Sequence, residues 1–158
     1  MGNLKTNAMR ILDKKKINYE VLTYDNIDGK IDGISVSEKI GKDSKIVYKT
    51  LITIGHSNNY YVFVIPVCEE IDMKKAAKAA NEKNIEMIHV KDINKVTGYI
   101  RGGCSPLGMK KNYNTYIDKR AKDNEEIVFS AGKIGFQIAL KIEDLENTID
   151  FKYTDLIK

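Results

Sequence analysis

Residues 46–55 read Ile-Val-Tyr-Lys-Thr-Leu-Ile-Thr-Ile-Gly, and this segment decides the fold. It is rich in β-branched and aromatic residues and ends in glycine, which predicts a strand. The two-residue period of a strand places Lys49 between Val47 and Leu51 on one face and Thr50 on the other. An ammonium group between apolar neighbours must reach water, find a partner or hold an anionic ligand, because an unpaired buried charge is costly. Two interpretations remain open here: a lysine that protects a strand edge from aggregation, and a lysine that binds an anion.

Outward from this strand, short strands and short helices alternate without a regular order. The other expected strands are Tyr19–Tyr24, Tyr60–Ile65, Glu86–Val90, Asn114–Ile117, Ile127–Ser130 and Phe136–Leu140. The expected helical segments are one through Leu4, Ala8, Ile11 and Leu12, one from a capping box at Ser35 to Gly41, one from Asp72 to Asn81, a turn at Asp92–Val96, and one at Glu143–Ile149. This order excludes a regular βαβ repeat and predicts a mixed, largely antiparallel α+β fold.

The composition predicts one globular domain over residues 1–158. Of these 158 residues, 42% are hydrophobic and 30% are charged, and no linker-like segment divides them. No apolar stretch approaches the roughly 20 residues that a membrane-spanning helix needs. The N-terminal residues lack the apolar core of a signal peptide, so we expect a cytoplasmic protein. A net charge of +4 permits a polyanionic partner without requiring one.

A glycine-rich loop at residues 102–108 is the second informative segment. It is neither a dinucleotide-binding fingerprint nor a phosphate-binding P-loop, because neither motif occurs in the chain. Gly102 and Gly103 stand just before a Ser105-Pro106 turn, where their backbone N–H groups are not shielded by side chains. Such donors could hold an oxyanion or a phosphate, and the alternative is a tight loop without a ligand.

The reactive side chains form no recognisable catalytic or metal-binding set. Cys104 lies inside the glycine-rich loop, but neither His56 nor His89 has a sequence context that ties it to this cysteine as a base. With Cys68, these residues have no metal-ligand spacing. An enzyme built from this chain is therefore expected to work without a metal, a cofactor or a protein nucleophile.

Several segments together resemble the YbaK/EbsC family of trans-editing aminoacyl-tRNA deacylases. They are Tyr24, residues 47–51, 72–79, 97–99 and 102–108, and residues 130–133 with Gly135. The resemblance extends from the first helix to about Leu145. It implies a single domain with a curved, mixed, mainly antiparallel sheet and helices around it. The same domain occurs as an editing insertion in bacterial prolyl-tRNA synthetases.

The resemblance also implies a reaction. The domain would clear cysteine mischarged onto proline tRNA, with the thiol of the substrate attacking the aminoacyl ester to leave a cyclic thiolactone. Its partners would be aminoacyl-tRNA(Pro) and prolyl-tRNA synthetase. No membrane, metal or cofactor is implied.

Site residues follow by position from the same resemblance. Lys49 would be the essential lysine of the pocket, and Gly102 would direct its backbone N–H at the substrate carbonyl. The residues expected to bind substrate are Tyr24, Thr50, Gly103, Ser105, Pro106, Ser130 and Gln137.

Two departures affect the expected selectivity. Gln137 stands where cysteine-specific members carry an aspartate, and Asp32 stands near the place of a pocket aromatic. Three rival hypotheses therefore remain. They are a deacylase for another small amino acid such as alanine, a non-catalytic module that binds tRNA or synthetase, and a thiol hydrolase that depends on Cys104. Assays with proline tRNA charged with cysteine, alanine or serine would separate them.

Overall fold

The computed structural model describes residues 5–158, and its helices are short; the three longest are capped at their N-termini by Thr6, Asp32 and Asp72. The α-helices are α1 (Asn7–Lys14), α2 (Gly33–Ile40), α3 (Met73–Ala80), α4 (Ile93–Thr97) and α5 (Ile142–Glu146), and the 3₁₀ turns are η1 (Val90–Asp92) and η2 (Lys119–Asp123). The Asp72 carboxylate accepts hydrogen bonds from the first turn of α3, and Asn81 ends that helix in a left-handed conformation. Both features confirm the boundaries expected from the sequence.

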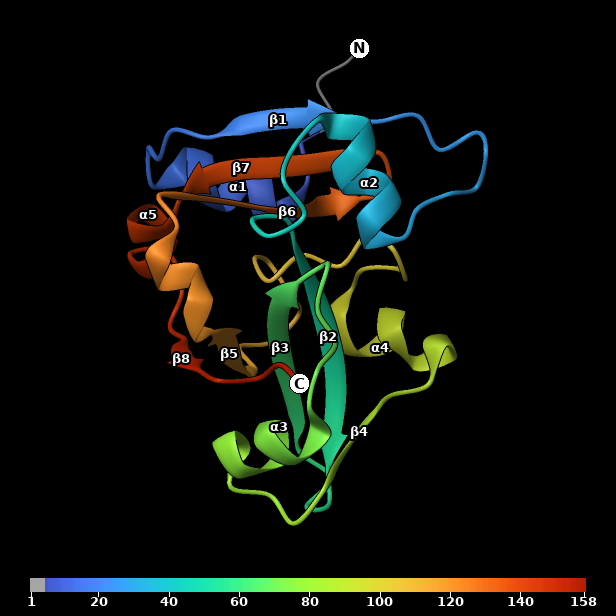
Figure 1. Cartoon of the computed structure of the whole chain (residues 1–158), viewed down its shortest axis with the longest axis vertical. Coiled ribbons are helices and arrows are strands. Elements are labelled where there is room, and N and C mark those ends of the chain that lie inside the picture. Colours follow the sequence, from blue (N-terminus) through green and yellow to red (C-terminus); the bar gives the residue numbers. More distant parts are fainter. Residues whose placement is uncertain (1–4) are drawn as a thin grey trace.

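The strands form two sheets that β2 brings together. They are β1 (Glu20–Thr23), β2 (Tyr48–Gly55), β3 (Tyr60–Pro66), β4 (Ile85–Met87), β5 (Asn114–Asp118), β6 (Glu126–Lys133), β7 (Phe136–Lys141) and β8 (Lys152–Thr154). One sheet has the order β1-β7-β6 and is antiparallel, whereas the other has the order β4-β2-β3-β5-β8 and contains parallel pairs at β3–β5 and β5–β8. A parallel bridge between Val47, the residue before β2, and Val128 of β6 joins them. Figure 1 shows the start of β2 next to the three-stranded sheet. The α+β class is confirmed, but the one curved sheet that was expected is divided in two.

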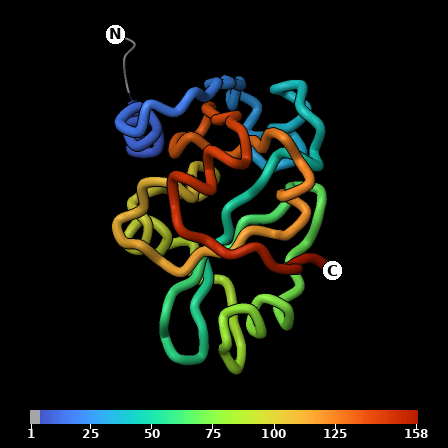
Figure 2. The backbone as a smooth tube through the Cα atoms, turned by 90° about the vertical axis from the view of Figure 1, so that its left-hand side faces the viewer, coloured from blue at the N-terminus to red at the C-terminus, as the bar shows by residue number. Residues whose placement is uncertain are grey.

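Apolar side chains from both sheets make one core, and helix α3 covers a second. The first cluster joins α1 and α5 to both sheets through side chains such as Leu12, Phe129 and Leu145. The second packs Phe63 of β3 against Ala76 of α3. Figure 2 shows α1 and the three-stranded sheet at one end of the molecule, with the β2–β3 turn and α3 at the other.

Three expectations about the elements need correction. Helix α2 is capped by Asp32, whose carboxylate accepts hydrogen bonds from the Ser35 backbone N–H and hydroxyl, so the capping box at Ser35 was wrong. Strand β8 was not expected, because its three residues carry no clear alternation. The strand expected at Glu86–Val90 ends at Met87, where η1 begins soon after. Leu4 of the expected first helix lies outside the described residues. No helix within residues 5–158 has both the length and the apolar character to cross a membrane.

Ion pairs and hydrogen bonds hold the last residues of the chain beside α3. The Asp155 carboxylate accepts from the Arg120 guanidinium at 2.6 Å and from the Lys75 ammonium at 2.9 Å. Arg120 also pairs with the fully buried Asp118, which accepts from the Leu156 backbone N–H. The neighbouring Arg120, followed by Lys75, holds the pKa of Asp155 well below its ordinary value.

This pKa shift leads to the first prediction. A carboxyl group with a lowered folded-state pKa stabilises the protein above the unfolded-state pKa of about 3.9, and the contribution is lost as the pH falls below it. We expect Asp155→Asn to lower the melting temperature at pH 7 by about 2–4 °C, with a difference that shrinks below about pH 4. Thermal unfolding at several pH values measures it. The exposed Asp123, replaced in Asp123→Asn, is the control and should show little change; equal losses at every pH would contradict the electrostatic account.

Candidate active site

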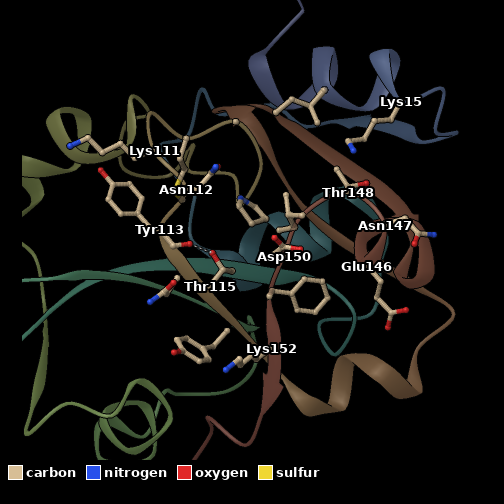
Figure 3. A pocket seen from close by; sticks show the side chains of 18 residues that line it. Lys15, Lys111, Asn112, Tyr113, Thr115, Glu146, Asn147, Thr148, Asp150 and Lys152 are labelled. Carbon is tan, nitrogen blue, oxygen red and sulfur yellow. Dashed lines mark hydrogen bonds between the residues drawn. The ribbon is translucent and has the colours of Figure 1, made fainter.

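Two large cavities differ sharply in the residues that line them. One, of about 770 Å³, lies between α1, the segment after the glycine-rich loop and the α5–β8 connection. Figure 3 shows its side chains, which include both basic residues such as Lys15 and acidic residues such as Glu146. This cavity contains neither Lys49 nor Gly102. Its slightly larger size does not make it the better candidate, because Pro106 is the only one of the nine expected site residues among the described residues that line it.

The second cavity, of about 740 Å³, contains six of the nine expected site residues. It lies where the three-stranded sheet, α2, the first half of β2 and α4 meet. Those that line it are Tyr24, Lys49, Thr50, Gly102, Ser130 and Gln137. Segments more than 100 residues apart in the chain thus contribute to one cavity, and we take it as the candidate active site.

In the described part of the chain, the first half of strand β2 is paired on one edge only, and its unpaired edge borders the cavity. Its ladder with β3 runs from Tyr48 to Ile54, whereas its ladder with β4 covers only Thr53–Gly55. The residues around Lys49 and Thr50 therefore have β3 on one side and the cavity on the other. Lys49 and Thr50 point to opposite faces of the strand, so the cavity wraps around its edge.

Strand register places the next group of polar residues on a common face. Ser130 of β6 lies directly opposite Gln137 of β7, and Leu22 of β1 lies opposite Gln137 on the other side. Tyr24 follows Leu22 by two residues, and its backbone N–H donates to the Gly135 carbonyl, which keeps it in line with β7. Directly opposed side chains lie about 4.5–5.5 Å apart at Cβ. The sheet therefore places Ser130 directly opposite Gln137, with Tyr24 on the same face as a diagonal neighbour of Gln137, about 7–8 Å away.

The Lys49 ammonium has no carboxylate partner among residues 5–158. It is half-buried, and none of the ion pairs within that range includes it. Asp32 is the one acidic residue that lines the cavity, and its carboxylate already accepts two hydrogen bonds from Ser35. Those hydrogen bonds lower the pKa of Asp32, so it is a carboxylate at neutral pH. Lys49 is thus available for an anionic or carbonyl group of a ligand.

Gly102 occupies a position that other residues would fit poorly. Its φ of +84° lies in the left-handed region, and a Cβ there would come within 2.8 Å of the Ile31 Cδ1 atom. Its backbone N–H has no hydrogen-bond partner in the described part of the chain. The Tyr99 hydroxyl donates to the Leu107 carbonyl at 2.6 Å and so braces the loop. Gly102 therefore places a backbone donor without a described partner at the edge of the cavity.

Three expected substrate contacts lie outside this cavity. The Gly103 backbone N–H donates to the Ile100 carbonyl in a turn, and the fully buried Ser105 hydroxyl accepts from the Leu107 N–H. Pro106 lines the other cavity. Gly103, Ser105 and Pro106 are therefore not among the residues that line this cavity, and their role as substrate contacts stays a prediction.

Ile31 and Arg101 are among the cavity residues that the sequence analysis did not single out. Ile31 packs over Gly102, and Arg101 lines the cavity beside it. Asp32 and Gly102, which directly follow Ile31 and Arg101, were named from the sequence. Ile31 and Arg101 themselves belong to no periodic pattern or motif that would mark them as site residues. Within residues 5–158, no group of three or more histidine, cysteine, aspartate and glutamate side chains is arranged to hold a metal.

Cys104 lines the cavity but is poorly suited to be a nucleophile. Its Sγ lies 3.4 Å from the Ile100 carbonyl oxygen, and burial raises the pKa of the thiol to about 11. A thiol with this pKa is almost entirely protonated at pH 7, and the thiolate is the reactive form. The geometry thus favours a packing role.

We therefore expect Cys104→Ser to keep most of any hydrolytic activity of this cavity, within a few-fold of the unmodified protein. Serine is close to isosteric and preserves a donor toward the Ile100 carbonyl. Steady-state kinetics with the same ester substrate would measure this. Complete loss of activity at an unchanged melting temperature would instead support the Cys104-dependent hydrolase.

Comparisons with known proteins identify the family of this chain. The model of the aminoacyl-tRNA editing domain family matches residues 34–148. A curated relative from Enterococcus faecalis, EbsC, is 40% identical over 152 residues, which cover 96% of this chain and 93% of EbsC. EbsC is provisionally named a Cys-tRNA(Pro)/Cys-tRNA(Cys) deacylase.

Solved structures with low sequence identity share the fold. One, provisionally described as a trans-editing enzyme for prolyl tRNA synthetase, has a TM-score of 0.84 at 17% identity and covers 99% of each chain. Another, the hypothetical protein APE2540, has a TM-score of 0.85 at 14% identity and covers 97% of this chain and 100% of its own. The fold is therefore shared with proteins whose sequences have diverged widely from this one.

Proposed function

Because the chain belongs to the aminoacyl-tRNA editing domain family, we propose that it is a trans-editing deacylase that removes cysteine from mischarged proline tRNA. One observation carries the proposal: Lys49, whose ammonium has no carboxylate partner in residues 5–158, and Gly102, whose backbone N–H has no partner there, line the same cavity. The name of its relative EbsC supports cysteine as the amino acid.

The proposed reaction uses the thiol of the substrate as its nucleophile. The sulfur of the cysteinyl group, as thiolate, attacks the ester carbonyl carbon, and a C–S bond forms as negative charge moves to the carbonyl oxygen. The carbonyl then re-forms, the C–O bond to the tRNA breaks, and the 3′-terminal ribose leaves with its oxygen, which takes up a proton to become a hydroxyl group. The other product is a cyclic thiolactone, which water later opens to cysteine. No protein nucleophile is needed, in agreement with the poor suitability of Cys104.

Gly102 and Lys49 would contribute through position and charge. The Gly102 N–H would donate to the carbonyl oxygen as charge develops there, and such donors commonly provide the largest single contribution to catalysis. Holding the thiol against its own carbonyl adds the advantage of an intramolecular reaction. Lys49 would bind a phosphate or carbonyl oxygen of the acylated 3′ end. These roles require fixed groups, and β2 and the braced loop supply them.

The substrate implies the partners and the compartment. The proposed partner is aminoacyl-tRNA(Pro), and prolyl-tRNA synthetase is proposed as a second partner because it produces the mischarged tRNA. Since charged tRNA is used in the cytoplasm, we propose that the protein acts there.

Deacylation of defined substrates tests the function. The purified protein is incubated with proline tRNA charged with cysteine, alanine or serine, and the remaining ester is measured over time against spontaneous hydrolysis. We expect rapid loss of cysteine and much slower loss of serine and alanine. Preferential loss of alanine would favour the alanine-specific rival, and tight tRNA binding without loss of any ester would favour the non-catalytic module.

A further inference from the structure

Resting on the function proposed above, we propose that the cavity recognises the free α-ammonium group of the aminoacyl ester through Tyr24, Thr50 and Gln137. The substrates would then be esters of amino acids with an unmodified amino group. Esters of Nα-acylated amino acids, including peptidyl-tRNA, would be excluded.

Three side-chain oxygens carry this proposal. The Tyr24 hydroxyl, the Thr50 hydroxyl and the Gln137 amide oxygen are buried and have no hydrogen-bond partner among residues 5–158. Tyr24 is only 9% exposed and Gln137 only 6% exposed, yet both line the cavity, as does Thr50. Buried polar atoms are nearly always hydrogen-bonded in folded proteins, and an unsatisfied one is costly. Three of them at one cavity indicate a ligand group that completes them.

The chemistry of these atoms selects the ligand group. The Gln137 amide oxygen can only accept a hydrogen bond, and the two hydroxyl oxygens can accept as well. Next to the reacting carbonyl, the aminoacyl group carries an α-ammonium, which has three donors and no acceptor. Three acceptor oxygens match these three donors. An Nα-acyl group would remove the charge and two of the donors, and it would add bulk and an acceptor.

The charges that line the cavity suit an ammonium at one end and an anion at the other. The Asp32 carboxylate, with its lowered pKa, supplies a negative charge at the start of α2. Lys39 of the same helix lies 5.9 Å from the centre of the Tyr24 ring, but its ammonium is paired with Asp28. Lys49 and Arg101 supply positive charge that would favour the phosphate end of the ligand. The ammonium would therefore lie against the three-stranded sheet, and the tRNA end would extend toward Lys49 and Arg101.

Tyr48 also has an unsatisfied hydroxyl, but we do not include it in the proposed ammonium site. Tyr48 lines the cavity and its hydroxyl lacks a partner in the described residues, but its side chain packs in the apolar core. Burial, followed by the nearby Asp118 carboxylate, raises the pKa of Tyr48. Asp118 does not line the cavity. We therefore leave Tyr48 out of the proposed ammonium site.

Binding to stable analogues tests the proposal without relying on catalysis. The probe is 3′-(L-cysteinyl)amino-3′-deoxyadenosine, in which an amide replaces the ester, and its Nα-acetyl derivative is the comparison. We expect calorimetric titration of the unmodified protein to show affinity at least about 10-fold higher for the free amine, the effect of one hydrogen bond to a charged group. Equal affinities, including no detectable binding of either compound, would overturn the proposal.

Variants separate recognition from structure. Tyr24→Phe and Thr50→Val remove hydroxyl groups that have no partner in the free protein. We expect each to weaken binding of the free amine by roughly 10- to 100-fold, with little effect on the acetyl derivative and no fall in melting temperature. The control is Tyr113→Phe, which removes a hydroxyl that donates to the Val96 carbonyl at 2.6 Å. It should lower the melting temperature and leave binding unchanged. A destabilised Tyr24→Phe with unchanged binding would overturn the proposal.

Cleavage assays then distinguish this inference from the function on which it depends. Nα-acetylcysteinyl-tRNA(Pro) keeps the thiol and the ester, so it should be chemically competent but poorly cleaved. Equal cleavage of the free and acetylated substrates would overturn the ammonium site and leave the deacylase proposal intact. If neither is cleaved while the free-amine analogue still binds selectively, the ammonium site stands and the proposed reaction is wrong.

Discussion

Lys49→Ala is expected to lower kcat/KM for deacylation of Cys-tRNA(Pro) by at least about 10²- to 10³-fold. This is the usual cost of removing one fixed group that stabilises developing charge. The ammonium lies at the cavity without a carboxylate partner in residues 5–158, so its removal breaks no ion pair described there and should leave the fold intact. Initial rates and melting temperatures of the variant and the unmodified protein measure both effects.

The control and a conservative variant sharpen this test. Lys141 is a strand lysine too, but it is exposed and does not line the cavity, so Lys141→Ala should keep full activity. Lys49→Arg should also be poor, because a planar guanidinium does not replace a compact ammonium. Near-normal turnover by Lys49→Ala would remove the basis of the proposed mechanism.

Cys-tRNA(Pro) is expected to be cleared far faster than Ser-tRNA(Pro), although the two substrates differ by one atom. A binding pocket alone usually separates such close analogues by only about 10- to 200-fold. The proposed nucleophile is the side chain of the substrate, and a thiol with a reference pKa of about 8.5 ionises far more readily than an alcohol. The preference should therefore exceed what binding alone explains. Parallel single-turnover measurements on the same tRNA give the ratio.

The pH dependence provides a second sign of this mechanism. Because the thiolate is the attacking form, the single-turnover rate on Cys-tRNA(Pro) should rise with pH through the titration of the substrate thiol. The slow rate on Ser-tRNA(Pro) should show no such step. Equal rates on cysteinyl, seryl and alanyl esters would point instead to a water molecule as the nucleophile.

The sequence predicted features that depend on local chemistry. The strand around Lys49 follows from β-branched residues, and helix α3 follows from the Asp72 cap and an alanine-rich run. The family motifs also identified six residues that line one cavity. Their convergence depends on strand register, such as Ser130 opposite Gln137, which is a property of the assembled sheet.

Features that depend on tertiary contacts could not be predicted from the sequence. Ser35 followed by Glu38 has the spacing of a capping box. The N-cap of α2 is Asp32 instead, and its carboxylate accepts hydrogen bonds from the Ser35 N–H and hydroxyl. Gly103 was expected to bind substrate, and its backbone N–H donates to the Ile100 carbonyl in a turn. Strand β8 pairs with β5, and Asp155, the residue just after it, accepts a hydrogen bond from Arg120. Both partners lie far from β8 in the sequence. In each case the competing partner is identified only in the folded chain.

Cleavage of S-methylcysteinyl-tRNA(Pro) tests the central claim most directly. The methyl group blocks the thiol and leaves the ester, the α-ammonium and the tRNA unchanged. The account predicts decay no faster than spontaneous hydrolysis, together with competitive inhibition of Cys-tRNA(Pro) cleavage, which shows that the blocked substrate still binds. Decay of the S-methylated ester at a rate close to that of Cys-tRNA(Pro) would contradict the account.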